Sequence, residues 1–431
     1  MISIFIDKMD QVFCALTLSQ IISLSATALI EPFLIDEAKN HDISTDFLKF
    51  AIILSLSLPI VTSPIIGKNL QRFGRRKLFV ISCILQGIPF LFFSLLSHIN
   101  SAFYLFLSLI AFIIFALGLS ISLTSTISFV ALYYPTFMES RLGRVQILST
   151  FGAMIVASFG ITMYNVFGFT VFCLVFGIGI FIYTPIIYQL LPEDNKYVEL
   201  DEVIQFKKII RLPSIEITGM LQIFAYASYS FLGPVLSSYL LTFNLTAKSM
   251  TLIVFLLNIS FGLGLAGIRF INIDRKYFMV IGIFCVGLGD LFLLIHNEWV
   301  LGLSLTLLGF GTSFSTLTVL PDMIDTAMQV FNYYNDSHVS DFISGIISAL
   351  WCSGNLIGYL IAKSLYKSIG FNFCEAIMGV ATLIFCLGFA GYLRLNKPIR
   401  RKASKTILLG HELDNISQNT EMTSFNLNSQ H

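Results

Sequence analysis

GKNLQRFGRRK, residues 67–77, carries five cationic side chains and no acidic one. It separates two long uncharged runs, ILSLSLPIVTSPII at 53–66 and LFVISCILQGIPFLFFSLLS at 78–97. About 20 apolar residues suffice for a helix to cross the hydrocarbon core of a bilayer, because each residue rises 1.5 Å. The stretch therefore predicts a short polar connection between two membrane-spanning helices.

The composition of the whole chain points the same way. Of 431 residues, 56% are hydrophobic and only 12% are charged, against about 25% charged in an ordinary soluble domain. The net charge of +1 gives no indication of a nucleic-acid partner. The seven cysteines occur singly, which predicts small buried apolar side chains and no disulfide or zinc framework. The sequence predicts an all-α protein embedded in a lipid bilayer.

Apolar runs of spanning length recur along the chain. One division depends on a turn signal, NVFGF at 165–169, which splits an uncharged stretch too long for one helix. The most economical reading is twelve transmembrane helices: 11–32, 49–66, 78–97, 102–132, 145–164, 169–190, 215–241, 249–268, 277–295, 299–320, 342–362 and 374–393.

The positions of the cations predict the orientation, because short loops rich in Lys and Arg stay cytoplasmic. With the amino terminus inside, 21 of the 26 Lys and Arg fall on one side. We therefore expect both termini in the cytoplasm. The sequence does not distinguish the plasma membrane from an intracellular vesicle membrane. A glycosylation sequon, Asn244-Leu-Thr246, falls in a predicted outer loop close to the membrane.

The most charged segment between two spans divides the chain into halves. We predict an amino-terminal six-helix half at 1–191, a cytoplasmic central loop at 192–214, a carboxyl-terminal six-helix half at 215–394 and a cytoplasmic polar tail at 395–431. Within the loop, DEVIQFKKII is compatible with a short amphipathic helix or with a solvated linker. GIRFINIDRK at 267–276 follows the second span of the second half, and it repeats the charged break at an offset of 200 residues.

The loop, the twelve spans and the repeated break together resemble the major facilitator superfamily. The signature of that family after the second span is G-x-x-x-D-R-x-G-R-R/K, and residues Gly67, Arg72, Gly74, Arg75 and Arg76 match it. PFLIDEA at 32–38, TSPIIGK at 62–68, FLGPVLSSYL at 231–240 and the stretch from 344 to 380 resemble the vesicular amine and polyamine transporter-like branch, which is related to drug:proton antiporters. The resemblance implies two parallel six-helix repeats and a solute site near the bilayer midplane.

Several positions depart from the family pattern. Gln71 stands where the loop normally has Asp, Gln146 lies where relatives tend to carry Glu, and Gly233 and Ser237 lie where relatives tend to carry acids. These departures weaken the expectation of proton exchange.

The loop cations allow two interpretations. Arginines at helix ends can bond exposed carbonyls and so hold one of two alternating states. Alternatively, the cations only anchor the cytoplasmic face. The residues of this candidate gating loop are Gly67, Gln71, Arg72, Gly74, Arg75 and Arg76, with Asp274 and Arg275 from the repeated break.

Ionisable residues inside membrane spans are functional candidates by default. Glu31, near the outer end of the first span, is a candidate ion or proton site, with interfacial solvation as the alternative. Asp290 lies deeper, in a helix that the resemblance makes peripheral, so we expect it to be structural. Glu216 and Glu375 stand within two residues of span ends and are expected to be solvated.

Neutral polar and aromatic residues are the candidates for a solute cavity. They are Gln146, Gln222, Tyr226, Tyr229, Asn258, Trp351 and Asn355, and those within one span share a helical face. Aromatic faces can hold an organic cation by cation–π attraction. Tyr and Trp at these spacings are also common packing residues, so the alternative is a core without a ligand.

The chain carries no HExxH, no metal-binding Cys/His spacing and no phosphate loop, so we expect neither an enzyme nor a cofactor. We predict a secondary transporter of a small organic solute that works by alternating access as a monomer, and the resemblance implies a cationic amine or polyamine exchanged for protons. The alternatives are a proton-independent facilitator of a neutral solute such as a sugar, and a non-transporting relative that acts as a receptor.

Overall fold

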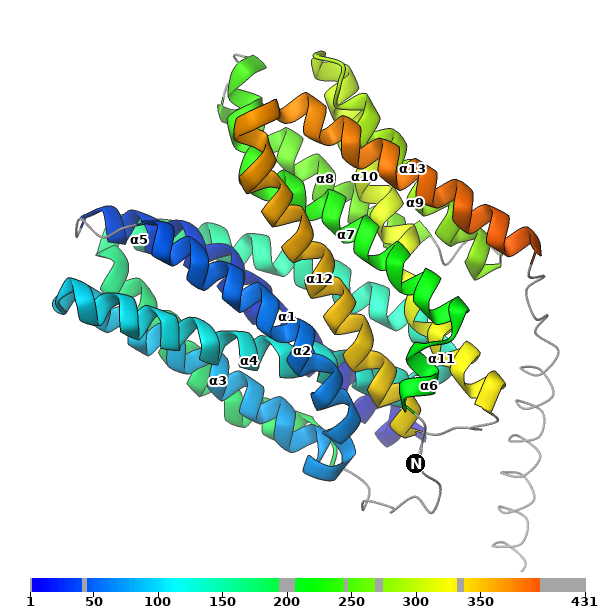
Figure 1. Ribbon diagram of the computed structural model, residues 1–431. Helices are drawn as coiled ribbons and strands as arrows, with labels where there is room; N and C mark the ends of the chain where they lie inside the picture. Colours follow the sequence, from blue (N-terminus) through cyan, green and yellow to red (C-terminus); the bar gives the residue numbers. More distant parts are fainter. Residues whose placement is uncertain are drawn as a thin grey trace, which may run out of the picture. The chain divides into compact units, whose positions relative to one another are not determined.

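The computed structural model describes residues 2–40, 45–193, 206–243, 247–267, 274–331 and 337–395. Every regular element in these ranges is a helix (Figure 1). The sequon at 244–246, most of the predicted central loop and nearly all of the tail lie outside the described residues. The α-helices are α1 Ile2–Asn40, α2 Thr45–Phe73, α3 Arg75–Leu95, α4 Ser101–Tyr133, α5 Met138–Leu190, α6 Phe206–Ile210, α7 Pro213–Leu240, α8 Ala247–Gly267, α9 Arg275–Phe292, α10 Glu298–Leu317, α11 Val319–Phe331, α12 Ser337–Ile369 and α13 Phe371–Leu395.

Eight helical segments of the described chain are long and apolar enough to cross a membrane. A bilayer offers no hydrogen-bond partners to the backbone, so an apolar run placed in it satisfies its N–H and C=O groups as a helix. This confirms a multi-span all-helical protein, and the total of twelve spans remains a prediction. The segments are Asp10–Ile30, Phe50–Phe73, Arg75–Leu95, Phe103–Tyr133, Met138–Leu190, Glu298–Phe331, Ser337–Tyr366 and Phe371–Leu395.

Helix α5 contains the break expected at NVFGF. Gly168 has φ 80° and ψ 175°, a conformation open to glycine because it has no Cβ. A Cβ placed on Gly160 would lie 3.1 Å from the ring of Phe172, whereas twelve residues of straight helix would separate the two by about 18 Å. The chain therefore folds back at Gly168, and α5 is two antiparallel arms joined at one glycine.

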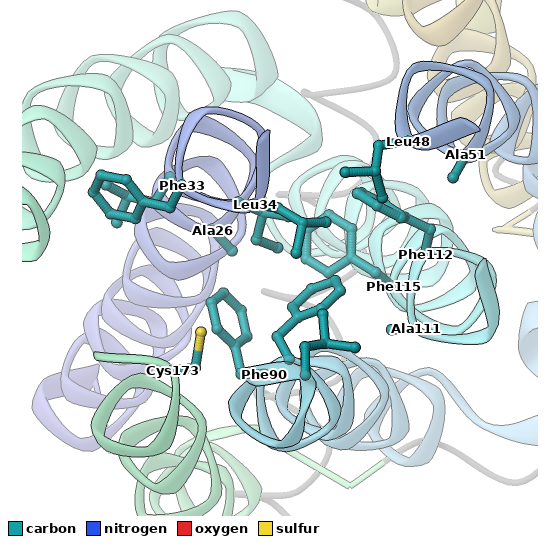
Figure 2. Close-up of a cluster of buried hydrophobic side chains, with 14 of the residues drawn as sticks. Ala26, Phe33, Leu34, Leu48, Ala51, Phe90, Ala111, Phe112, Phe115 and Cys173 are labelled. Carbon is teal, nitrogen blue, oxygen red and sulfur yellow. The ribbon is translucent and has the colours of Figure 1, made fainter. Parts of the chain in front are cut away.

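Apolar side chains of α1 to α5, together with Tyr359 of α12, form one buried cluster. Figure 2 shows Phe33 of α1, Phe90 of α3, and Phe112 and Phe115 of α4 within it. A second cluster, which includes Phe231, gathers residues of α7 to α10 and α12 with the start of α13. Each set of helices thus has its own packed core.

Helix α12 packs against α7 on one side and against α2 and α4 on another, so it links the two sets of helices. The contact with α2 depends on two glycines. A Cβ on Gly67 would lie 2.6 Å from the backbone oxygen of Asp341, and a Cβ on Gly345 would lie 2.4 Å from that of Ser63. These helix backbones therefore touch directly. The sites described below lie within one compact unit, Met1–Leu387, and a second unit is Gly388–His431.

Candidate functional site

Arg75, from the cationic loop, is buried and paired with an acid from α12. Its Nε donates to Asp341 Oδ1 at 3.1 Å, and its Nη2 donates to Asp341 Oδ2 at 2.6 Å. Ser128 of α4 also donates to this carboxylate. The side chains of Arg75 and Asp341 are 8% and 1% exposed. A planar guanidinium fits a carboxylate through two parallel bonds, and this geometry gives the pair directional specificity as well as charge compensation.

The other loop residues divide into several roles. Gln71 Nε2 donates to Ser337 Oγ on α12 at 2.6 Å. Gly74 has φ 85° and separates α2 from α3. Arg76 donates from Nε to the backbone oxygen of Tyr188 at 2.9 Å, near the end of α5, and its guanidinium lies 3.9 Å from that ring. Arg72 is exposed. The loop therefore contacts α12 through Gly67, Gln71 and Arg75.

The repeated break forms a matching set of ion pairs. Arg275 pairs with Glu139 at the start of α5, and its Nη1 lies 2.5 Å from Asp325 Oδ2 on α11. Arg275 follows Arg75 by 200 residues, and Asp341 follows Glu139 by 202. Each arginine of the repeat thus reaches across to an acid of the other set of helices. Asp274 precedes α9 as its N-cap residue without a side-chain capping bond.

Residues of α7 and α12 bring most of the cavity candidates together. The rings of Tyr226 and Trp351 lie 5.5 Å apart. Tyr229 donates from its hydroxyl to Asn258 Oδ1 on α8 at 3.0 Å. Asn355 takes part through its backbone oxygen, which accepts from Ser230 Oγ at 3.0 Å. These contacts connect α7, α8 and α12 through aromatic and neutral polar groups.

Two glutamines carry buried oxygen atoms without a hydrogen-bond partner among the described residues. They are Gln222 on α7 and Gln146 on α5, and in both cases the atom is Oε1. A buried acceptor left unpaired costs about 1–3 kcal/mol, so each is a position where a donor from a bound molecule would be stabilising. Glu31 lies on α1, but its side chain and that of Ser237 are outside the described set; Gly233 is exposed.

Sequence reasoning missed Asp341 and Glu139 as partners of the arginines. Both acids stand close to predicted span ends, where charged residues are common, so neither one had a distinctive local pattern. The usable signal was the repeat itself, because an acid recurs at nearly the same offset as the arginine. The partners lie 266 residues apart in the case of Arg75 and Asp341, too far for any local motif to connect them.

Long apolar helices, duplicated charged breaks and ion pairs between two sets of helices define a multi-span membrane transporter. The family model described as Major Facilitator Superfamily matches residues 16–268, and the chain belongs to this family. It is thus a transporter-family protein and not an enzyme.

Curated relatives cover most of the chain at low identity. The "MFS-type transporter SLC18B1" of Rattus norvegicus is 24% identical over 398 residues, which are 88% of this chain and 86% of the relative. The human protein of the same name is 23% identical over 413 residues, 92% of this chain and 89% of the relative. These matches support the resemblance to the vesicular amine transporter-like branch.

Solved structures share the fold. The human organic anion transporter MFSD10 (TETRAN) superposes with a TM-score of 0.69 at 16% identity, covering 88% of this chain and 99% of that one. The transporter FucP, in its outward conformation, gives 0.68 at 14% identity, covering 88% and 98%. At such identities the likeness establishes the fold alone.

Proposed function

We propose that this chain is a secondary transporter that moves a small organic cation, an amine or polyamine, by alternating access and in exchange for protons. The observation that carries the proposal is the group of aromatic rings and unpaired oxygen acceptors on α7, α12 and α5. The transporter fold and the relatives named above support the same class of activity.

The solute chemistry follows from the side chains. A cation over a desolvated aromatic face gains about 2 kcal/mol, and Tyr226 beside Trp351 offers two such faces. Amine N–H groups are donors, and Gln222 Oε1 is a buried acceptor that lacks one. An amine would therefore find attraction for its charge and a partner for its hydrogens at the same place.

Alternating access needs contacts that hold one state and can be broken in another. The pairs Arg75–Asp341 and Arg275–Glu139 join the two sets of helices. Both follow the second span of their repeat, so they close the same end of the protein in the predicted topology. We propose that they form a latch over the cytoplasmic end, and that solute leaves or enters there when they separate.

A second candidate is a proton-independent facilitator of a neutral solute such as a sugar. It is favoured by one feature: the seven cavity candidates are uncharged side chains. Hydrogen-bonding amides and aromatic rings also suit a polyhydroxylated ligand. This candidate retains the same site and the same latch.

Reconstituted vesicles given a panel of amines, polyamines and sugars, with and without a pH gradient, separate these functions. We expect gradient-driven uptake of an amine. Gradient-independent uptake of a neutral solute would establish the facilitator, and no uptake of any solute would leave a receptor-like role. Trp351→Ala and Tyr226→Ala should each reduce uptake at least tenfold while surface expression is retained. Trp299→Ala is the matched control, because Trp299 is 88% exposed.

The membrane arrangement is part of the proposal. We propose twelve spans in two six-helix halves, with the bounds predicted from the sequence, both termini cytoplasmic, and a functional monomer. The repeated ion pairs support the two halves, since matched residues would occupy matched places in a duplicated fold.

A further inference from the structure

Two fully buried carboxylates lie on α9 and α13, away from the solute candidates. Asp290 and Glu375 are each 0% exposed. A Cβ on Gly379, one turn after Glu375, would lie 3.0 Å from the Cβ of Asp290, so α13 packs directly against α9 at this level. Glu375 is therefore not solvated as its position near a span end had suggested, because α13 begins early enough to place it inside the packed helices.

The carboxylates have almost no hydrogen-bond donors. Asp290 Oδ2 accepts from Ser228 Oγ at 2.7 Å. Asp290 Oδ1 and both oxygens of Glu375 have no partner among the described residues. Buried carboxylates in proteins are normally paired with cations or several donors, because an ionised group loses its hydration on burial. At three orphaned oxygens in one place, a bound proton or cation would therefore be stabilising.

Within the described part of the chain, the helices around the pair place no Lys or Arg beside it. On α9, Lys276 precedes Asp290 by 14 residues, about 21 Å along a helix. On α10 the titratable residue is Glu298, at its first position, and on α7 they are Glu216 and three tyrosines. α13 has no Lys or Arg before Arg394.

Two groups normally uncharged at neutral pH interact with Glu375: the Tyr239 hydroxyl of α7 and the Cys374 thiol of α13. His296, beyond the end of α9, lies edge-on to the Tyr239 ring, with centroids 6.2 Å apart. Asp290 and Glu375 would repel one another if both were ionised. On α12, Lys363 follows Ala362 of the second core cluster, but its Nζ donates to the Tyr359 hydroxyl at 2.5 Å. Among the described neighbours, the pair therefore has no compensating Lys or Arg.

We propose that Asp290 and Glu375 form a proton-binding site that holds at least one proton at neutral pH. A proton from water adds to a carboxylate oxygen and gives a neutral acid, which removes the uncompensated charge and supplies a donor. Two carboxylates that share a site behave in this way because both cannot remain ionised. The inference rests on burial and orphaned oxygens, and it is independent of the identity of the transported solute.

The close packing of α9 against α13 means that loss of the proton would disturb the contact between these helices. A Cβ on Gly287 would lie 2.8 Å from the Leu383 side chain, so α9 and α13 leave no room for water between them there. Loss of the proton would place an ion at this interface, and the helices would have to separate to hydrate it. Proton binding and the docking of α13 are thus linked.

Infrared difference spectroscopy on the full chain in lipid vesicles tests the site. The wild type should show the carbonyl stretch of a protonated carboxylic acid at about pH 7, where solvated Asp and Glu are ionised. The double variant Asp290→Asn/Glu375→Gln should lose this band. Glu216→Gln, which removes an exposed acid of α7, should retain it.

Three results would overturn the inference. The first is a wild-type spectrum without the band in sodium-free buffer. The second is a band that survives in the double variant, since the proton would then reside elsewhere. The third is a band that is present in choline buffer and disappears when Na⁺ replaces choline. The ligand of the two carboxylates would then be a metal cation and not a proton. The wild-type spectrum at about pH 7 and the comparison of Na⁺ with choline remain decisive even if the double variant does not fold.

Discussion

At the residue scale, Arg75 depends on a single carboxylate. Its guanidinium is almost fully buried, and Asp341 binds it through two nitrogen atoms. Breaking a buried pair by removing one partner typically costs about 3–5 kcal/mol, because the other charge is left without compensation. Removing both charges is less costly than the sum of the two single changes.

We predict that Asp341→Asn and Arg75→Gln each lower the free energy of unfolding by about 3–5 kcal/mol. The double variant should recover part of this loss, since neither charge is then stranded. Thermal unfolding of the purified variants in detergent measures the effect. Arg72→Gln, at an exposed position of the same loop, should change stability by less than about 0.5 kcal/mol. Strictly additive losses would mean that the pair contributes nothing as a pair.

The sequence predicted Arg75 as a residue of a gating loop but did not predict its partner. The glycine and arginine pattern of 67–77 is local, and it predicts a cationic turn after a span. Asp341 lies near the start of a different span, and no local pattern marks it as the partner of Arg75. In the same way, Tyr226 and Tyr229 were predicted as candidates from their shared helical face, while the burial of Glu375 depended on where α13 begins.

At the scale of elements, the α2–α12 contact depends on glycine. In an isolated helix Ala is about 1 kcal/mol more favourable than Gly, so a glycine in the helix interior needs a reason. At Gly345 the reason is the backbone of α2, which would lie 2.4 Å from an added Cβ.

Gly345→Ala should therefore destabilise the protein in spite of the gain in helix propensity. We expect a lower thermal midpoint and easier labelling of a cysteine placed at Ser337, because α12 must move away from α2. Gly179→Ala in α5 is the matched control, since a Cβ there meets nothing within 4 Å. A Gly345→Ala variant as stable as the Gly179→Ala control would contradict the close backbone contact.

Helix α5 shows how far local sequence information extends. The NVFGF signal located the break correctly, because a positive φ calls for glycine and Gly168 is the glycine in that motif. The signal did not indicate that the connection would be so short that helix continues almost to the turn. Turn propensity predicts where a chain can reverse, whereas packing of Gly160 on Phe172 decides how tightly it does so.

At the scale of the whole molecule, the latch should control transport. We predict that a short bifunctional maleimide that joins Gln71→Cys to Ser337→Cys will stop uptake in vesicles. These side chains are 2.6 Å apart at the interface of α2 and α12, and a covalent link would prevent their separation. Either single cysteine treated with the same reagent should transport normally. Full uptake by cross-linked protein would show that this contact persists throughout the cycle.

The predicted orientation has its own test. Epitope tags at the two termini should be accessible from the same, cytoplasmic face of membrane vesicles of known orientation, because the cations of the sequence gather on that side. A tag inserted at residues 41–44, in a predicted outer loop, should be accessible from the opposite face. Termini on opposite faces would exclude an even number of spans.

The fold class could be predicted because a bilayer restricts the choices. Apolar runs of spanning length become helices, and the charged breaks between them mark their ends. The arrangement of helices across the two halves could not be predicted from local patterns. It depends on contacts such as Gly67 with Gly345, whose partners are distant in sequence and whose residue types are ordinary.

Each set of helices supplies one arginine and one acid to the ion pairs that join the two sets. This arrangement limits which chimeric proteins will be stable. Arg75 and Asp341 lie on opposite sides of the central segment, as do Arg275 and Glu139. A hybrid that takes residues 1–191 from this chain and the remainder from a relative inherits both Arg75 and Glu139 without their counterparts. Swaps between relatives will therefore yield stable proteins when the donor supplies an acid at the position of Asp341 and a cation at that of Arg275. Domain shuffling in this lineage is constrained to fragments that change both ends of each pair together.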